Sequence, residues 1–234
     1  MIKVLSHTGN EVYIGHFQGN IIKKYMDIVE EYSQNRVLVT PRVSVITAFT
    51  EREKAITALQ LELSNVPYTN ACPNNVESWS NVDKIKYYVE ALEKTTSEYA
   101  LLVDGYDVLF FKNIDEEFIS KFEGMGKKIM FNATKNNHPN FEIDKVTNRD
   151  SLGEFKYLNA GVAFGKTSDL LAFYKEALEY TKMENIVNPW NSEQMFVRMA
   201  SNGKDYVGFD YGCLLFQTFS KTNATACGNT KIII

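Results

Sequence analysis

Two aspartates three residues apart, Asp104 and Asp107, follow directly on an apolar run. Side chains at i and i+3 of a strand do not share a face, so these carboxylates converge only if the chain turns between them. Gly105 lies between them and permits such a turn. Convergent carboxylates at a strand end can bind a hard divalent cation that carries a phosphate-bearing ligand. The same motif also fits a polar turn in a β-hairpin, and by itself it leaves both interpretations open.

The composition indicates a chain that can fold around one sizeable core. It has 234 residues, of which 44% are hydrophobic, and a net charge of −4 at pH 7. The acidic balance argues against a nucleic-acid surface, which would favour a basic patch. Three cysteines without C-x-x-C spacing predict reduced thiols. Because no apolar run reaches the length of a membrane span or resembles a signal peptide, we expect a cytoplasmic protein without a membrane span.

Strand and helix patterns alternate along the chain without a long linker. Apolar runs predict strands at 43–49, 101–104, 128–133, 157–165 and 213–217, and helical spacing predicts helices at 51–66, 83–94, 116–122, 168–180 and 191–200. The first 40 residues add a short strand candidate at 2–5 and a helix around 22–29. This alternation favours an α/β fold with a central sheet between helices.

Ligands of such sheets bind beyond the carboxyl ends of the strands. Three candidate segments are expected there: Thr47–Phe49, Asp104–Asp107 and the residues after Asn159. Gly161 stands inside a predicted strand, where a glycine often marks the close approach of a ligand or another backbone. A β-bulge capped by Asn159 is the alternative interpretation. Farther along, Asn191 and Gln194 have the spacing of a helix capping box.

Five segments in order carry a resemblance to a known family: Val45-Ile-Thr-Ala-Phe49, Asp104-Gly-Tyr-Asp-Val108, Tyr157-Leu-Asn-Ala-Gly161, Ser192-Glu-Gln-Met-Phe196 and Phe209-Asp-Tyr-Gly-Cys213. Together they resemble a nucleotide-sugar glycosyltransferase of the A-type fold. More narrowly, the chain is similar to the glycosyltransferase domain of procollagen lysyl hydroxylases and its microbial and viral relatives. The resemblance implies a Rossmann-like mixed sheet flanked by helices.

The resemblance also implies a donor site. Asp104 and Asp107 would hold Mn²⁺ or Mg²⁺, which bridges the diphosphate of a UDP-sugar. Thr47, Ala48 and Phe49 would border the uridine, although a buried strand end is the alternative. Lys84 would lie near the donor, although a solvated lysine at a helix start fits equally well.

A second group of residues would surround the reaction centre. Asn159 and Gly161 would lie beside the transferred sugar, Gln194 would contact the donor, and Glu193 would act as general base or stabilise positive charge on the sugar. The predicted catalytic residues are thus Glu193, Asn159 and Asp107. Ser192-Glu193-Gln194 departs from the family's Asp-Asp-Gln, which leaves the identity of the base and the type of acceptor open.

The third metal ligand of the family is a histidine after the final strand. The histidines of this chain, His7, His16 and His138, all lie upstream of that place. Either Cys227 replaces the histidine, or the chain stops short of the segment, and we expect weaker metal affinity in both cases. His138 falls in a polar loop and either reaches the site or stays an exposed loop histidine.

The predicted organisation is an N-terminal extension over 1–40 packed on a catalytic domain over 41–234, the latter possibly truncated at its C-terminus. The predicted function is metal-dependent transfer of a hexose, glucose or galactose, from a UDP-sugar to a hydroxyl-bearing glycan or peptide. The alternative is a catalytically silent module of the same fold that binds nucleotide-sugar or a partner.

Overall fold

The structure is a computed structural model that describes residues 6, 10–18, 30–32, 34–73, 80–139, 154–183, 188 and 191–219. The predicted strand at 2–5 and helix around 22–29 lie outside these residues, as do Cys227 and the C-terminal Lys231–Ile234. Among the described residues, no helix combines the length and apolarity needed to cross a membrane.

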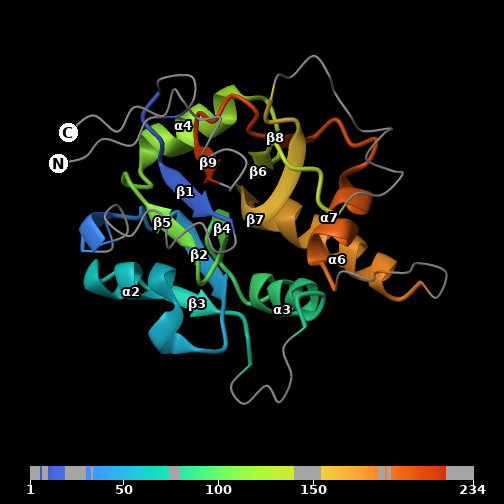
Figure 1. The fold of residues 1–234 in the computed structure, drawn as a ribbon, viewed down its shortest axis with the longest axis horizontal. Helices are drawn as coiled ribbons and strands as arrows, with labels where there is room; N and C mark the ends of the chain where they lie inside the picture. The colour runs from blue at the N-terminus through green and yellow to red at the C-terminus, as the bar shows by residue number, and fades with distance from the viewer. Residues whose placement is uncertain are drawn as a thin grey trace.

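A six-stranded mixed sheet forms the centre of the molecule (Figure 1). Its order is β3 (Tyr68–Asn70), β2 (Val43–Ala48), β4 (Tyr99–Asp104), β7 (Tyr157–Lys166), β6 (Ile129–Thr134) and β8 (Val207–Phe209). β7 runs antiparallel to both of its neighbours, and the other paired strands are parallel. The predicted α/β fold with a mixed sheet flanked by helices is confirmed.

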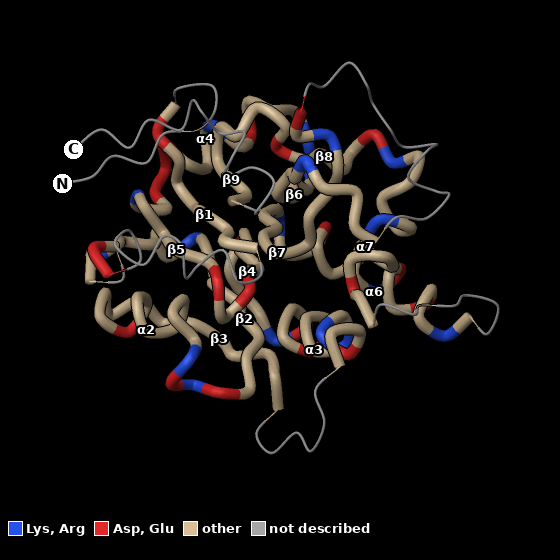
Figure 2. The backbone as a smooth tube through the Cα atoms, in the orientation of Figure 1, with Lys and Arg blue, Asp and Glu red and all other residues tan. Residues whose placement is uncertain are grey.

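Helices cover both faces of this sheet. One apolar cluster joins the sheet to α3 (Asp83–Leu92), α6 (Thr167–Thr181) and α7 (Glu193–Ser201). A second cluster joins the other face to α2 (Ile56–Leu63), α4 (Glu116–Gly124) and a smaller sheet. The residues of β4 contribute alternately to the two clusters, as expected for a strand buried on both faces. Charged residues lie mostly on the helices and connecting segments around the six-stranded sheet (Figure 2).

The smaller sheet has three strands in the order β5 (Val108–Phe110), β1 (Ile14–Phe17) and β9 (Phe216–Phe219). β1 is antiparallel to β5 and parallel to β9, so a segment near the N-terminus is the middle strand (Figure 1). Ile14 and Phe17 are fully buried, and Phe17 stacks on Phe219 with ring centroids 4.9 Å apart. The domain division at residue 40 stays a prediction, but β1 is an integral part of the core.

Two predicted elements differ from the structure because side chains bond to the main chain. Asp210 is fully buried and accepts the backbone N–H groups of Leu214, Leu215 and Phe216 at 2.9, 2.6 and 2.8 Å. These bonds form a turn, so the last strand begins at Phe216 and not at Cys213.

The second difference concerns α2, predicted over 51–66 with its apolar side chains facing the core. The helix spans 56–63, and Leu59 and Leu63 are 38% and 51% exposed. Thr57 and Gln60 are buried instead. The side-chain amide of Gln60 donates to the carbonyl of Phe110 and accepts its N–H, at 2.8 and 2.9 Å. Main-chain groups of β5 supply hydrogen-bond partners for both polar side chains. Thr57 and Gln60 can therefore be buried on the inner face of the helix.

Candidate functional site

Asp104 and Asp107 lie where the chain passes from one sheet to the other. β4 belongs to the six-stranded sheet and β5 to the three-stranded sheet, and the two strands do not pair. The β-hairpin interpretation of this motif is therefore wrong. The hydroxyl of Thr57 in α2 lies 2.8 Å from the carbonyl oxygens of both Asp104 and Val108, which fastens the two ends of the turn.

The sequence predicted that Gly105 supplies the backbone conformation of a turn, but the structure requires a glycine here for close packing. Its backbone does not have a positive φ. A Cβ at this position would lie 2.9 Å from both the carbonyl oxygen of Ala48 and the Cβ of Phe49. The glycine therefore lets the turn pack against the end of β2, and the close approach requires it.

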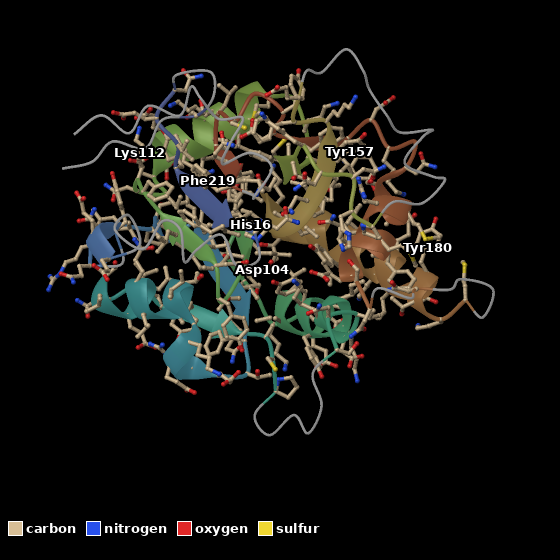
Figure 3. All side chains as sticks on the ribbon, in the orientation of Figure 1. His16, Asp104, Lys112, Tyr157, Tyr180 and Phe219 are labelled. Atoms are coloured by element: carbon tan, nitrogen blue, oxygen red, sulfur yellow. The ribbon has the colours of Figure 1, made fainter. Side chains whose placement is uncertain are left out.

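The two aspartates meet a histidine from β1. His16 Nε2 lies 3.4 Å from Asp107 Oδ2 and 3.7 Å from Asp104 Oδ2, and its side chain is 4% exposed. Potential ligand atoms of the three residues all lie within 4.8 Å of one another. His16 and Asp104 point toward one another at the centre of the molecule (Figure 3). Neither Cys227 nor a segment beyond the final strand is needed for a third candidate ligand, because β1 lies between β5 and β9 and brings His16 beside the two aspartates.

The local sequence carried only a faint signal for His16. It is the one basic residue in a mostly apolar run from Val12 to Phe17. Burial alone would lower the pKa of His16, but the carboxylates of Asp107 and Asp104 outweigh burial and raise it. For Asp104, burial itself raises the pKa and outweighs the lowering effect of the Lys84 ammonium.

Lys84 connects Asp104 to Glu193. It lies in the first turn of α3, its side chain is 6% exposed, and its Nζ lies 2.6 Å from Asp104 Oδ1. The same ammonium forms an ion pair with Glu193 at the start of α7. These two carboxylates outweigh the effect of burial and raise the pKa of Lys84 well above its ordinary value. The lysine is thus a buried bridge, and its predicted contact with the donor stays a prediction.

β7 carries a bulge at Asn159–Gly161. The pairing with β6 shifts register between Phe131 and Asn132. Asn159 Oδ1 accepts the N–H of Gly161 at 2.9 Å, and Gln194 Oε1 accepts the N–H of Ala160 at 3.0 Å. The bulge capped by Asn159 is therefore confirmed, while the predicted contacts of Asn159 and Gly161 with a sugar stay predictions.

The predicted capping box is wrong. α7 begins at Glu193, and its N-cap residue Ser192 makes no side-chain capping bond. Gln194 uses its side-chain oxygen for β7, while its side-chain N–H group donates to the carbonyl of His138. Asn191 accepts instead a hydrogen bond from the Ser80 hydroxyl at 2.8 Å.

Most of these side chains line one cavity of about 170 Å³. It is lined by His16, Gln18, Asp104, Asp107, His138, Asn159, Gly161, Ser192, Glu193 and Gln194. Six of them are predicted site residues: Asp104, Asp107, Asn159, Gly161, Glu193 and Gln194. Thr47, Ala48, Phe49 and Lys84 are buried next to the cavity and do not line it, so their predicted roles at the donor stay predictions.

The ligand chemistry of this cavity suits a divalent cation. Two carboxylate groups and one imidazole nitrogen are ligands that Mn²⁺ accepts, and carboxylates also suit Mg²⁺. All three side chains are at most 23% exposed, so an ion between them would lie at the bottom of the cavity. The residues present therefore fit the metal that the sequence predicted.

The match to a family model, on a mixed α/β fold, indicates a domain of the glycosyltransferase type. The family model of the PLOD GT domain, the glycosyltransferase domain of procollagen lysyl hydroxylases, matches residues 73–226. The match covers more than half of the chain, and the chain belongs to this family. No curated protein matches it. The matched region contains Asp104, Asp107 and Glu193, whereas His16 lies outside it.

Proposed function

We propose that this chain is a metal-dependent transferase that moves a hexose, glucose or galactose, from a UDP-sugar to a hydroxyl group of a glycan or peptide. One observation carries the proposal: His16, Asp104 and Asp107 converge in the same cavity as Asn159 and Glu193. Membership in a glycosyltransferase family supports it. The sequence-based expectation of reduced thiols supports a cytoplasmic location as a further part of the proposal.

The residues of the cavity divide the task between them. His16, Asp104 and Asp107 would hold Mn²⁺ or Mg²⁺. When bound, the ion supplies positive charge that stabilises the departing diphosphate. Lys84 holds Asp104 and Glu193 in fixed positions through its two ion pairs. Glu193 would accept the proton of the acceptor hydroxyl, and Asn159 would bind hydroxyl groups of the transferred sugar.

The test is the release of UDP from UDP-glucose and UDP-galactose in the presence of Mn²⁺. We expect turnover that EDTA abolishes and that Asp107→Ala lowers by at least about 100-fold, since the substitution removes a metal ligand. Asp205→Ala, which removes an exposed carboxylate, serves as the matched control. Equal turnover in Asp107→Ala and wild type would contradict the proposal.

A second candidate function is binding of a nucleotide-sugar without turnover. The observation in its favour is that Ser192 stands where the family has a carboxylate, while Glu193 is paired with Lys84. Calorimetry with UDP and Mn²⁺ separates the two functions. Binding that depends on Asp107, together with no turnover of any donor or acceptor, would establish the second candidate.

A further inference from the structure

Two side chains of α7 form hydrogen bonds to residues 137–139, a segment beside the cavity. Gln194 donates a hydrogen bond from its side-chain amide to the carbonyl of His138. Arg198 Nη1 donates to the carbonyl of Pro139 at 3.1 Å, and its Nη2 donates to Asn137 Oδ1 at 3.0 Å. Gln194 and Arg198 are four residues apart and therefore project from the same face of the helix.

These contacts are buried, so they fix the segment firmly. Gln194 is 7% exposed and Arg198 is 4% exposed. The guanidinium of Arg198 also lies over the ring of Tyr157, 5.5 Å from its centroid. If the segment moved away from α7, the buried guanidinium and its two acceptors, the Pro139 carbonyl and Asn137 Oδ1, would lose their hydrogen bonds. The main chain at 137–139 is therefore anchored to the same helix that presents Glu193.

The anchored segment places the side chain of His138 at the cavity. His138 lines the cavity together with Asp104 and Asp107, yet the residue is exposed. In the described part of the chain, its ring makes no hydrogen bond or ion pair. Since a neutral imidazole offers one N–H donor and one acceptor, it is suited to bind the hydroxyl groups of a sugar.

The order of groups in the cavity indicates which part of a ligand His138 would meet. His16, Asp104 and Asp107 form the metal side, which would take the diphosphate. The remaining polar side chains are Gln18, which follows β1, His138, and residues of β7 and of the start of α7. Both amide atoms of Gln194 are already used within the protein, whereas the exposed ring of His138 offers a donor and an acceptor to a ligand in the cavity.

We propose that His138 binds the hexose of the donor, and that Gln194 and Arg198 are positioning residues that hold it there. This inference rests on the proposed function, because it takes a UDP-hexose as the ligand. It assigns to Gln194 a role different from the donor contact that the sequence predicted.

The experiment compares the dissociation constants of UDP and of a UDP-hexose for the same protein in saturating Mn²⁺, measured by calorimetry. UDP-glucose and UDP-galactose are both titrated. For His138→Ala we expect unchanged affinity for UDP and about three- to tenfold weaker binding of the preferred UDP-hexose, the effect of one lost hydrogen bond. His138→Gln retains a donor and an acceptor and should restore most of the loss.

Asn136→Ala is the matched control, since this residue directly precedes the anchored segment and does not line the cavity. It should leave both constants unchanged. Equal weakening of UDP and UDP-hexose in His138→Ala, or no weakening of either, would overturn the assignment of His138 while leaving the proposed function intact. Failure of the wild type to bind UDP with Mn²⁺ would overturn the proposed function and this assignment with it.

Discussion

The imidazole of His16 lies directly against the backbone of Gly161. A Cβ added to Gly161 would come within 2.4 Å of His16 Cε1 and 2.8 Å of His16 Nε2. The glycine in the β7 bulge thus makes the space into which β1 inserts its histidine. Two segments far apart in the sequence form one wall of the cavity in this way.

Gly161→Ala should therefore displace His16 from Asp104 and Asp107. We expect a loss of about 1–3 kcal/mol in the free energy of unfolding, typical of overpacking a core, and a smaller stabilisation by Mn²⁺. Thermal unfolding with and without Mn²⁺ measures both. Gly124→Ala, where a Cβ would meet nothing within 4 Å, is the control: it should not lower the free energy of unfolding and should leave the stabilisation by Mn²⁺ unchanged.

His16→Ala tests the histidine directly. A metal that binds only the folded protein raises its melting temperature, and the rise depends on affinity. Loss of an outer-shell partner already lowers metal affinity by about 10- to 100-fold, so loss of a ligand should cost at least as much. We expect the Mn²⁺-induced rise in melting temperature to shrink strongly. An undiminished rise in His16→Ala would exclude His16 as a ligand.

Thr57→Val removes the hydroxyl that lies between the carbonyls of Asp104 and Val108. We expect a cost of about 1–2 kcal/mol in the free energy of unfolding, and weaker Mn²⁺ binding because the turn that carries both aspartates loosens. Thr167→Val is the matched control, since its hydroxyl donates to the carbonyl of Ser97 at 2.8 Å, away from the cavity. If both variants bound Mn²⁺ equally well, Thr57 would have only a general role in stability.

Lys84→Met should leave Asp104 and Glu193 without their shared cation. Removing one partner of a buried ion pair costs about 3–5 kcal/mol, and because the carboxylates are 23% and 14% exposed we expect about 2–4 kcal/mol. Urea unfolding without metal measures the loss. Lys86→Met, on the same helix but 61% exposed, should cost little. A loss no larger than that of Lys86→Met would show that Lys84 contributes no more than a surface pair.

Asp210→Ala should destabilise the turn that leads into β9. Three backbone N–H groups lose their acceptor, and we expect a cost of about 2–4 kcal/mol in the free energy of unfolding. Because β9 supports β1, weaker Mn²⁺ binding should accompany the loss. Asp205→Ala, an exposed aspartate, is the control for both measurements. Unchanged stability in Asp210→Ala would contradict the importance of this turn.

Much of the fold and part of the site could be predicted from local patterns. The strands β2, β4, β6 and β7 follow apolar runs, and the Asp104–Asp107 pair follows from a strand end with a glycine. The bulge at Asn159 also follows from one short segment. These features depend on neighbouring residues, so the sequence by itself determines them.

Only the tertiary structure decided the rest. His16 becomes a candidate metal ligand because β1 is the middle strand of the small sheet, and strand pairing over that distance leaves no periodic signal in the sequence. Thr57 and Gln60 face inward, while Leu59 and Leu63 stay exposed, because the main chain of the turn and β5 supplies partners for the polar groups. The sequence by itself determined the two carboxylates, and the packing of distant segments supplied the histidine that completes the site.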